Sequence, residues 1–215
     1  MIFFSPSERK VAETPNSKVA GGKMTEVSRR SSCVKEVLAS LPKPQVTRMK
    51  IISMGDENTG KSCIIKRYCE ERFIPKYITT IGVDYGVKRV VLEQNVDVRV
   101  NFWDFAGGNE YLEVRNEFYK DAQGAILVFD VTSMASFAHL ETWWRESVKW
   151  GAKDLVGCLC ANKVDLPKRV VSEVDGRKWA SAKGWGYFEV SASTGQNVST
   201  MLEQLFQDVY NLRKL

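Results

Sequence analysis

Long hydrophobic runs are missing from this 215-residue sequence, and their absence limits what the protein can be. The longest purely apolar stretches are as short as "AILVF", so no segment is expected to span a membrane. Ile2 to Phe4 is too brief for the hydrophobic region of a signal peptide. With 44% hydrophobic and 27% charged residues, the composition is that of an ordinary globular protein. We therefore expect one soluble, cytoplasmic domain with a sizeable core.

The sequence also lacks paired cysteines and has a single histidine. Its five cysteines are an odd number without the spacing of a metal site, which predicts reduced thiols in an intracellular compartment. Two of them, Cys158 and Cys160, are expected to share one strand face as small core residues. The histidine, His139, is expected on a helix surface and not in catalysis. The other cysteines are Cys33, Cys63 and Cys69.

Positive charge is concentrated at the start of the chain. Residues 1–48 hold nine Lys or Arg against four Glu, whereas the two signs balance in the remainder. The leading segment is rich in Ser, Pro, Gly and Lys and has little apolar periodicity. These features predict a disordered basic tail over residues 1–47 and a folded domain over residues 48–215. We expect the tail to be solvated, and we expect no nucleic-acid partner. Met24 is an alternative start of the chain.

Strand-like and helix-like patterns alternate along the domain. A short apolar run, "MKIISMG", precedes a helical pattern, and "GVKRVVLEQNVDVRVNFWD" predicts a hairpin that turns at residues 93–95. The runs "GAILVFDV" and "DLVGCLCAN" predict central parallel strands. A helix over "SFAHLETWWRESVKWG", one near residues 173–183, a strand "YFEVSAS" and a helix over residues 198–213 follow. The α/β alternation, with a single hairpin, predicts a mixed but mainly parallel sheet with helices on both faces.

The stretch "GDENTGKS" between the first strand and the first helix fits the phosphate-loop pattern GxxxxGK[ST]. Backbone N–H groups of such a loop converge on phosphate oxygens at the start of the following helix. Lys61 is expected to reach the β- and γ-phosphates, and the Ser62 hydroxyl to bind Mg²⁺. The predicted nucleotide-binding residues of this stretch are Gly55, Asp56, Glu57, Asn58, Thr59, Gly60, Lys61, Ser62 and Cys63.

Three further motifs follow in order. In "FWDFAGG", Asp104 can hold Mg²⁺ through water and Gly107 can donate its N–H to a γ-phosphate. In "ANKVD", Asp165 can accept hydrogen bonds from the N1–H and the amine of guanine, which adenine does not offer, while Asn162 and Lys163 flank the base. Backbone N–H groups of "SAS" can meet guanine O6; its residues are Ser191, Ala192 and Ser193. The motifs predict a site for GTP or GDP with Mg²⁺ and argue against an ATPase or kinase.

Taken together, these motifs resemble a P-loop small GTPase of the Ras superfamily, closest to the Rab branch. The resemblance implies an α/β fold with a six-stranded, mixed but mainly parallel sheet and five flanking helices. The stretches "GKSCIIKRYCEERF", "IGVDYGV", "EVRNEFYKD" and "CANKVD" resemble the RJL group, Rab-like proteins that in some members carry a J domain. The resemblance implies that Phe73 stacks on guanine, Tyr77 closes over the phosphates and Thr80 binds Mg²⁺ and senses the γ-phosphate. It also implies two switches, here the first switch (residues 74–84) and the second switch (residues 104–108).

Two departures from this family bear on turnover. The second switch of a Rab reads DTAGQ, and its glutamine orients the attacking water, whereas this chain has Gly108 at that position. A glycine there is also expected to loosen the segment. Glu57 stands where a small residue is usual, and its carboxylate either obstructs an incoming arginine finger near the γ-phosphate or points to solvent. The predicted catalytic positions are Lys61, Thr80 and Gly108, and hydrolysis is expected to be very slow.

A third departure concerns the end of the chain. The closing residues "DVYNLRKL" contain no cysteine for a prenyl anchor, and His139 is followed by Leu140 and Glu141, so the HPD tripeptide of J domains is not expected. The leading hypothesis is a monomeric GTP-dependent switch with unidentified effector, exchange-factor and activating proteins. A cycling GTPase that depends on an activating protein is the closest alternative. A pseudo-GTPase that binds no nucleotide is a third.

Overall fold

Apolar runs of the sequence form the central strands of the fold. The computed structural model describes residues 47–76, 78–152 and 154–213, so the predicted tail lies outside the described residues except for Thr47, which begins the first strand. The strands are β1 (Thr47–Met54), β2 (Val83–Leu92), β3 (Val96–Phe105), β4 (Gly124–Asp130), β5 (Val156–Asn162) and β6 (Gly186–Glu189). Every residue of β4 is buried, as expected for a strand covered on both faces.

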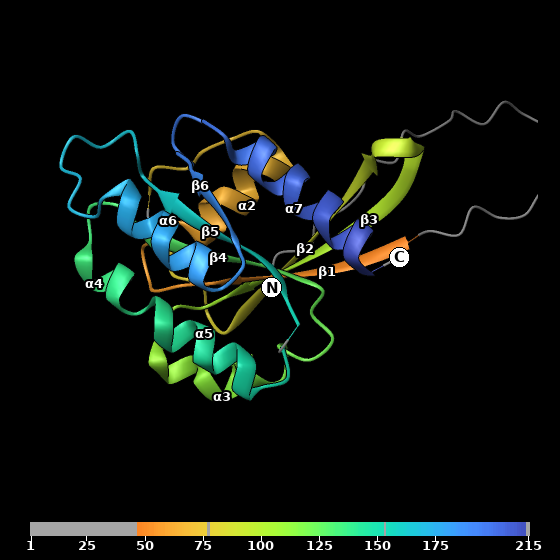
Figure 1. Ribbon diagram of the computed structural model, residues 1–215, viewed down its shortest axis with the longest axis horizontal. Coiled ribbons are helices and arrows are strands. Elements are labelled where there is room, and N and C mark those ends of the chain that lie inside the picture. Colours follow the sequence, from red (N-terminus) through yellow and green to blue (C-terminus); the bar gives the residue numbers. More distant parts are fainter. Residues whose placement is uncertain (1–46, 77, 153, 214–215) are drawn as a thin grey trace, which may run out of the picture. The chain divides into compact units, whose positions relative to one another are not determined.

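The strands make one sheet in the order β2-β3-β1-β4-β5-β6 (Figure 1). All neighbours are parallel except β2 and β3, which form the predicted antiparallel hairpin around Glu93–Asn95. The prediction of a six-stranded, mixed and mainly parallel sheet is confirmed. The loop that follows β1 lies at the carboxyl edge of the sheet, where ligands bind in open α/β folds. Since β1 has β3 on one side and β4 on the other, this loop is at the place where the strand order reverses.

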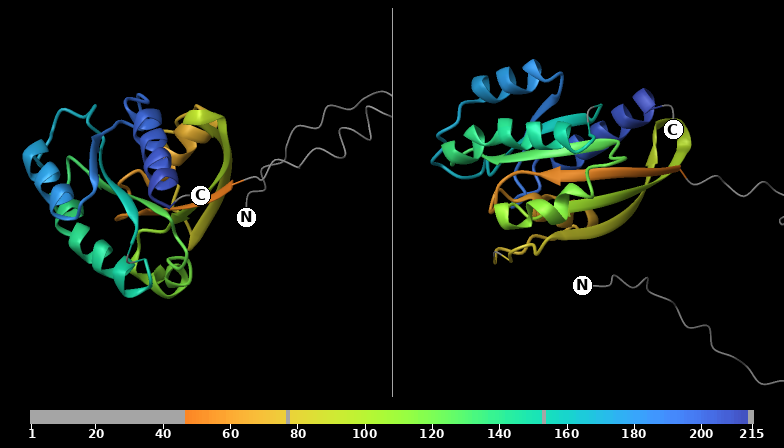
Figure 2. Two further views of the ribbon diagram at one scale, coloured as in Figure 1. Left: turned by 45° about the vertical axis from the view of Figure 1, so that its right-hand side comes forward. Right: turned by 90° about the horizontal axis from the view of Figure 1, so that it is seen from below.

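Helices cover both faces of this sheet. They are α2 (Lys61–Glu70), α3 (Leu112–Asn116), α4 (Met134–Ala138), α5 (Leu140–Lys149), α6 (Glu173–Ala182) and α7 (Val198–Arg213), with the short 3₁₀ helices η1 (Glu93–Asn95) and η2 (Asn109–Tyr111). Buried residues of α2 and α7 share one core cluster, and those of α5 and α6 share the other. Figure 2 shows α2 and α7 together on one side of the sheet and α3 with α5 on the other. None of the described helices combines the length and hydropathy needed to cross a bilayer.

Two predicted elements have different limits in the structure. The helix expected over "SFAHLETWWRESVKWG" consists of α4 and α5, joined by His139, whose φ of −80° and ψ of −5° remain in the right-handed region. If α4 and α5 are counted as one bent helix, the described α-helices number five, as predicted. The strand expected over "YFEVSAS" ends at Glu189, and residues 190–193 form a loop instead. Val190 N–H still bonds to β5, but the chain then turns, because Gly195 N–H donates to Ser191 O at 2.8 Å.

Three aromatic side chains join α2, β3 and α7 in the core. Phe206 packs edge-on against Tyr68 and Phe102, with ring centroids 5.8 and 5.9 Å apart. It is fully buried, and the two cysteines predicted in the core, Cys158 and Cys160, belong to the same cluster. The amphipathic helix α7 is thus attached to the sheet mainly through large apolar side chains.

Replacing Phe206 with Ala is therefore expected to lower the free energy of unfolding by about 3–5 kcal/mol, because the cavity cannot collapse fully. Urea unfolding followed by circular dichroism measures the change. Leu212→Ala on the same helix is the matched control, since Leu212 is 71% exposed and its truncation should change stability by less than about 0.5 kcal/mol. Similar losses in the two variants would contradict the assigned core.

Candidate functional site

A pocket of about 290 Å³ opens at the carboxyl edge of the sheet. Of the predicted site residues, those that line it are Glu57, Asn58, Gly60, Lys61, Ser62, Cys63, Phe73, Thr80, Gly107, Gly108, Asn162, Lys163, Asp165, Ala192 and Ser193. Those that do not line it are Gly55, Asp56, Thr59, Asp104 and Ser191, while Tyr77 lies outside the described residues. The lining also includes residues that the sequence did not single out, among them Ile78, Tyr111 and Leu166.

The phosphate loop between β1 and α2 adopts its shape because of left-handed backbone positions. Gly55 has a φ of +132°, and a Cβ there would lie 2.2 Å from Val128 O, so no side chain fits. Asn58 and Gly60 also have positive φ values, of 58° and 96°. Lys61 Nζ donates to Gly55 O at 2.7 Å and to Asp56 O at 2.8 Å, which holds the ammonium group within the loop.

Burial lowers the pKa of Lys61 in this loop. Desolvation lowers the pKa of Lys61 to about 8, although the nearby carboxylates of Asp104 and Asp56 oppose the shift. Anionic phosphates beside the ammonium group would favour its charged form. The local charges thus suit Lys61 as the cation of an anion-binding loop.

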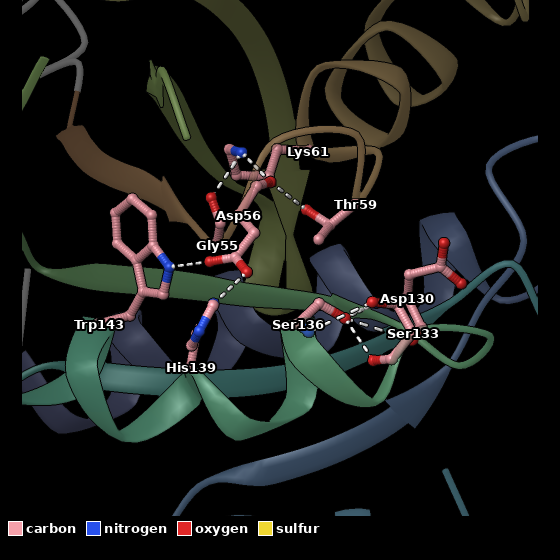
Figure 3. A network of polar contacts seen from close by, with 9 residues as sticks. All are labelled: Gly55, Asp56, Thr59, Lys61, Asp130, Ser133, Ser136, His139 and Trp143. Carbon is pink, nitrogen blue, oxygen red and sulfur yellow. Dashed lines mark hydrogen bonds and ion pairs between the residues drawn. The ribbon is translucent and has the colours of Figure 1, made fainter. Parts of the chain in front are cut away.

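The phosphate loop is also tied to α5, a contact that the sequence did not predict. Figure 3 shows Trp143 and His139 pointing at Asp56. Trp143 Nε1 donates to Asp56 Oδ1 at 2.8 Å, and His139 Nδ1 lies 2.7 Å from Asp56 Oδ2. His139 is mostly exposed, as expected, whereas Trp143 is buried.

The oxygen atoms predicted to hold Mg²⁺ lie near one another. Ser62 Oγ is 2.9 Å from Thr80 Oγ1, and the buried Asp104 has its Oδ1 2.5 Å from Ser53 Oγ. Burial raises the pKa of Asp104, against the opposing charge of Lys61. No group of three or more His, Cys, Asp or Glu is placed as a metal cluster in the described part of the chain. Two hydroxyls with a water-bridged carboxylate nevertheless suit Mg²⁺, which keeps several waters and binds phosphate oxygens.

At the other end of the pocket, polar groups surround the place expected for the base. Asp165 Oδ1 accepts from Ser191 Oγ at 2.7 Å, so a second carboxylate oxygen remains for a ligand. Lys163 Nζ pairs with Asp130 Oδ2 at 2.7 Å. Burial raises the pKa of Asp130, but hydrogen bonds from Lys163 and Thr132 lower it by more, so the carboxylate is favoured. The carboxyl group of Asp165, beside the Ser191 hydroxyl, fits the two N–H donors of guanine.

The second switch packs directly on the phosphate loop. A Cβ at Gly107 would lie 2.2 Å from Glu57 N, so only glycine fits at this position. Arg115 donates through Nη1 to Gly108 O at 2.7 Å and to Ala106 O at 3.3 Å. The expectation that Gly108 loosens the segment is therefore not supported, because its carbonyl is fixed by a buried guanidinium.

Arg115 is itself held by α5. Its Nε and Nη2 bond to the two carboxylate oxygens of Glu146 at 2.6 and 2.8 Å, and its Cζ lies 4.3 Å from the centre of the Trp143 ring. Tyr119 Oη donates to Glu146 Oε1 at 2.8 Å. Through Trp143, α5 thus contacts the phosphate loop and also Arg115, which holds the second switch. Arg115 lies in the stretch "EVRNEFYKD" that carries the resemblance, but no sequence pattern predicted its pairing with Glu146.

Comparison with known proteins identifies this arrangement. The profile of the Ras family matches residues 50–211. The chain belongs to the Ras family. Three similar relatives are named DnaJ homolog subfamily C member 27. The zebrafish (Danio rerio) protein is 47% identical over 171 residues, covering 77% of this chain and 62% of its own length. The bovine (Bos taurus) protein is 46% identical, covering 81% and 67%, and the human (Homo sapiens) protein is 46% identical, covering 77% and 62%.

These relatives confirm the predicted resemblance to Rab-like members of the Ras family related to J-domain proteins. This chain spans about 62% of the length of the zebrafish and human relatives. Membership of the Ras family implies that the pocket takes a guanine nucleotide and Mg²⁺, and the hydroxyls and carboxylates described above fit both.

Replacing Arg115 with Met should leave Glu146 buried without its partner. The free energy of unfolding is expected to fall by about 3–5 kcal/mol, the range seen when one member of a buried ion pair is removed. Urea unfolding measures it, with Arg145→Met on the same helix as Glu146 as control, because the exposed pair of Arg145 and Glu141 should contribute at most about 1 kcal/mol. Equal losses would show that the buried pair is not structural.

Proposed function

We propose that this chain is a guanine-nucleotide-dependent molecular switch that binds GTP with Mg²⁺, hydrolyses it very slowly and binds effectors in the GTP·Mg²⁺ state. The proposal rests on one observation: the pocket has the groups needed for binding but lacks a side chain at position 108. Groups suited to phosphates, metal and base are all present, whereas position 108 of the second switch carries no side chain.

Binding rests on groups that lie in or beside one pocket. Lys61 and the N–H groups at the start of α2 would hold the phosphates, and Asp165 would read the base. Ser62 and Thr80 would be direct ligands of Mg²⁺, and Asp104 an indirect one. When bound, Mg²⁺ neutralises charge on the phosphate oxygens. Thr80 belongs to the first switch, so its hydroxyl would connect that segment to the triphosphate state.

Slow hydrolysis follows from what surrounds the expected γ-phosphate. Gly107 and Gly108 offer backbone only, so neither position supplies an amide side chain to orient water. Glu57 lines the pocket and is exposed, so it can face both the ligand and solvent. A carboxylate here would oppose the negative charge that spreads over the transferred group, and it would occupy the approach of an arginine finger.

An apolar surface beside the switches supports the proposed output. Ile78 and Ile81 in the first switch are 60% and 80% exposed. Leu112 and Val114, just beyond the second switch, are also exposed, as is Tyr85 on β2. Exposed apolar groups gathered near a ligand site favour a protein partner, and their arrangement would depend on the nucleotide that orders both switches.

A cycling GTPase is the second candidate, and one contact favours it. A Cβ at Gly108 would lie 2.4 Å from Glu110 Oε2, so the Glu110 carboxylate occupies the space where a glutamine side chain would begin. A carboxylate in that space can accept a hydrogen bond from water. If Glu110 orients the attacking water, the chain turns GTP over despite Gly108.

Replacing Asp165 with Asn is expected to shift preference from guanosine to xanthosine nucleotides. The carboxylate accepts from both donors of guanine, whereas an amide donates to the extra carbonyl of xanthine. The ratio of the dissociation constants of XDP and GDP should change by about 10²-fold or more, since an unpaired polar group in a binding site is strongly rejected. Asp97→Asn on the hairpin is the control. An unchanged preference in the Asp165 variant would contradict the assignment of the base site.

Gly108→Gln is expected to raise single-turnover hydrolysis only in part, because Glu57 still places a negative charge at the γ-phosphate. Glu57→Gly combined with Gly108→Gln should raise it further, by about 10–100-fold over the unmodified chain, as better placement of the reactants allows. Phosphate release from preloaded GTP measures the rate, with GTP affinity checked in parallel.

Glu110→Ala separates the two candidate functions. The slow switch predicts that this variant hydrolyses GTP as slowly as the unmodified chain. If the unmodified chain already matches the double variant and Glu110→Ala removes that activity, Glu110 positions the water and the cycling GTPase is correct. A chain that binds neither GTP nor GDP would contradict both.

A further inference from the structure

Arg67 on α2 reaches the loop that follows β6. Its Nε donates to Ala192 O at 2.9 Å, and its Nη2 donates to Ser193 O. The contact joins residues that are 125 positions apart in the sequence. Ala192 and Ser193 both line the pocket, whereas Arg67 does not. Arg67 therefore binds the base loop (residues 191–195) from outside the pocket.

The direction of these bonds decides where the N–H groups of the base loop point. In a trans peptide, the C=O of one residue and the N–H of the next point in opposite directions. Arg67 binds Ala192 O from outside the pocket. The Ser193 N–H, which points the opposite way, is therefore turned toward the inside of the pocket. The Ala192 N–H is occupied by Asn162 Oδ1 at 3.1 Å, so the Ser193 N–H is the donor that remains for a ligand oxygen.

Arg67 also contacts the opposite wall of the base pocket. Its Nη1 donates to Glu71 O at 3.3 Å, just beyond the end of α2, where Glu71 has a left-handed φ of 58°. The guanidinium carbon lies 5.9 Å from the centre of the Phe73 ring, within the range of a cation–π contact. Phe73 lines the pocket. One guanidinium thus contacts both the aromatic wall and the backbone that faces the edge of the base.

We infer that Arg67 is a positioning residue for guanine recognition, which orients the Ser193 N–H toward O6 and supports Phe73 beside the base. The inference rests on the proposed function, because it assumes that the pocket takes guanine nucleotides. Arginine suits the task because its planar fork can bind two adjacent carbonyls at once, which a lysine ammonium cannot do in the same geometry.

The experiment compares GDP with 6-thio-GDP, which keeps the N1–H and the amine that Asp165 reads but replaces O6 with sulfur, a weaker acceptor. The full-length chain should bind GDP more tightly than 6-thio-GDP. In Arg67→Met, GDP affinity should fall by about tenfold or more, the equivalent of one lost hydrogen bond, and the ratio of the two dissociation constants should approach one. A merely structural role would weaken both nucleotides equally and leave the ratio unchanged.

Two matched variants complete the test. Arg67→Lys keeps the charge and most of the stem, so it is expected to fold even if Arg67→Met does not, and it should also reduce the ratio. Arg89→Met, at an exposed arginine paired with Asp97 on the hairpin, should leave the ratio as it is. Acceleration of GDP release by EDTA should be the same in all variants, because Arg67 does not touch the metal end of the pocket.

The outcomes distinguish this inference from the proposed function. If the unmodified chain binds no guanine nucleotide, the proposed function is wrong. If it binds GDP but discriminates no better than folded Arg67→Lys or Arg67→Met, the role of Arg67 is wrong while the proposed function stands. Equal affinity of the unmodified chain for GDP and 6-thio-GDP would likewise overturn the inference, since no O6 contact would exist to position.

Discussion

One buried carboxamide, that of Asn162, joins the two halves of the pocket. Its Nδ2 donates to Thr59 O in the phosphate loop at 2.7 Å, and its Oδ1 accepts from Ala192 N–H in the base loop at 3.1 Å. A Cβ at Gly60 would lie 2.2 Å from Nδ2, so the loop approaches this amide as closely as glycine permits. Since the side chain is 1% exposed, water does not compete for either bond. The distance between phosphate and base positions is thereby fixed before any ligand arrives.

Side chains also hold backbone carbonyls elsewhere around the pocket, which limits where the following N–H groups can point. Asn162, which lines the pocket, binds Thr59 O, and Arg67 binds Ala192 O from outside the pocket. Lys61 differs, because the carbonyls of residues 55 and 56 hold its ammonium inside the loop. Such fixed donors require little reorganisation when an anion or a carbonyl binds, which is how preorganised sites gain affinity.

Sequence patterns predicted those parts of this site that are local. The glycines and lysine of the phosphate loop, and the spacing from Asn162 to Asp165, are read within a few residues, and continuous apolar runs predicted the central strands. Contacts between distant segments have no such signal. Trp143 and Asp56 are 87 residues apart, so no local pattern predicted their contact. The end of β6 was missed for a related reason: "VSAS" suits a strand, but hydrogen bonds within the base loop turn the backbone after Val190.

Packing of the second switch bears on the two ways in which Gly108 is proposed to slow hydrolysis. A glycine at position 108 removes a side chain and also frees the backbone. The backbone is nevertheless held, because Arg115 binds the carbonyls on both sides of Gly107 and is itself fixed by Glu146. Gly107 further abuts the phosphate loop at Glu57 N. Position 108 therefore lacks a side chain that could orient water, whereas its backbone carbonyl is held in place. Under the proposed function, such a site would sense the γ-phosphate through its backbone while contributing little to cleaving it, which is the property that a long-lived GTP state requires.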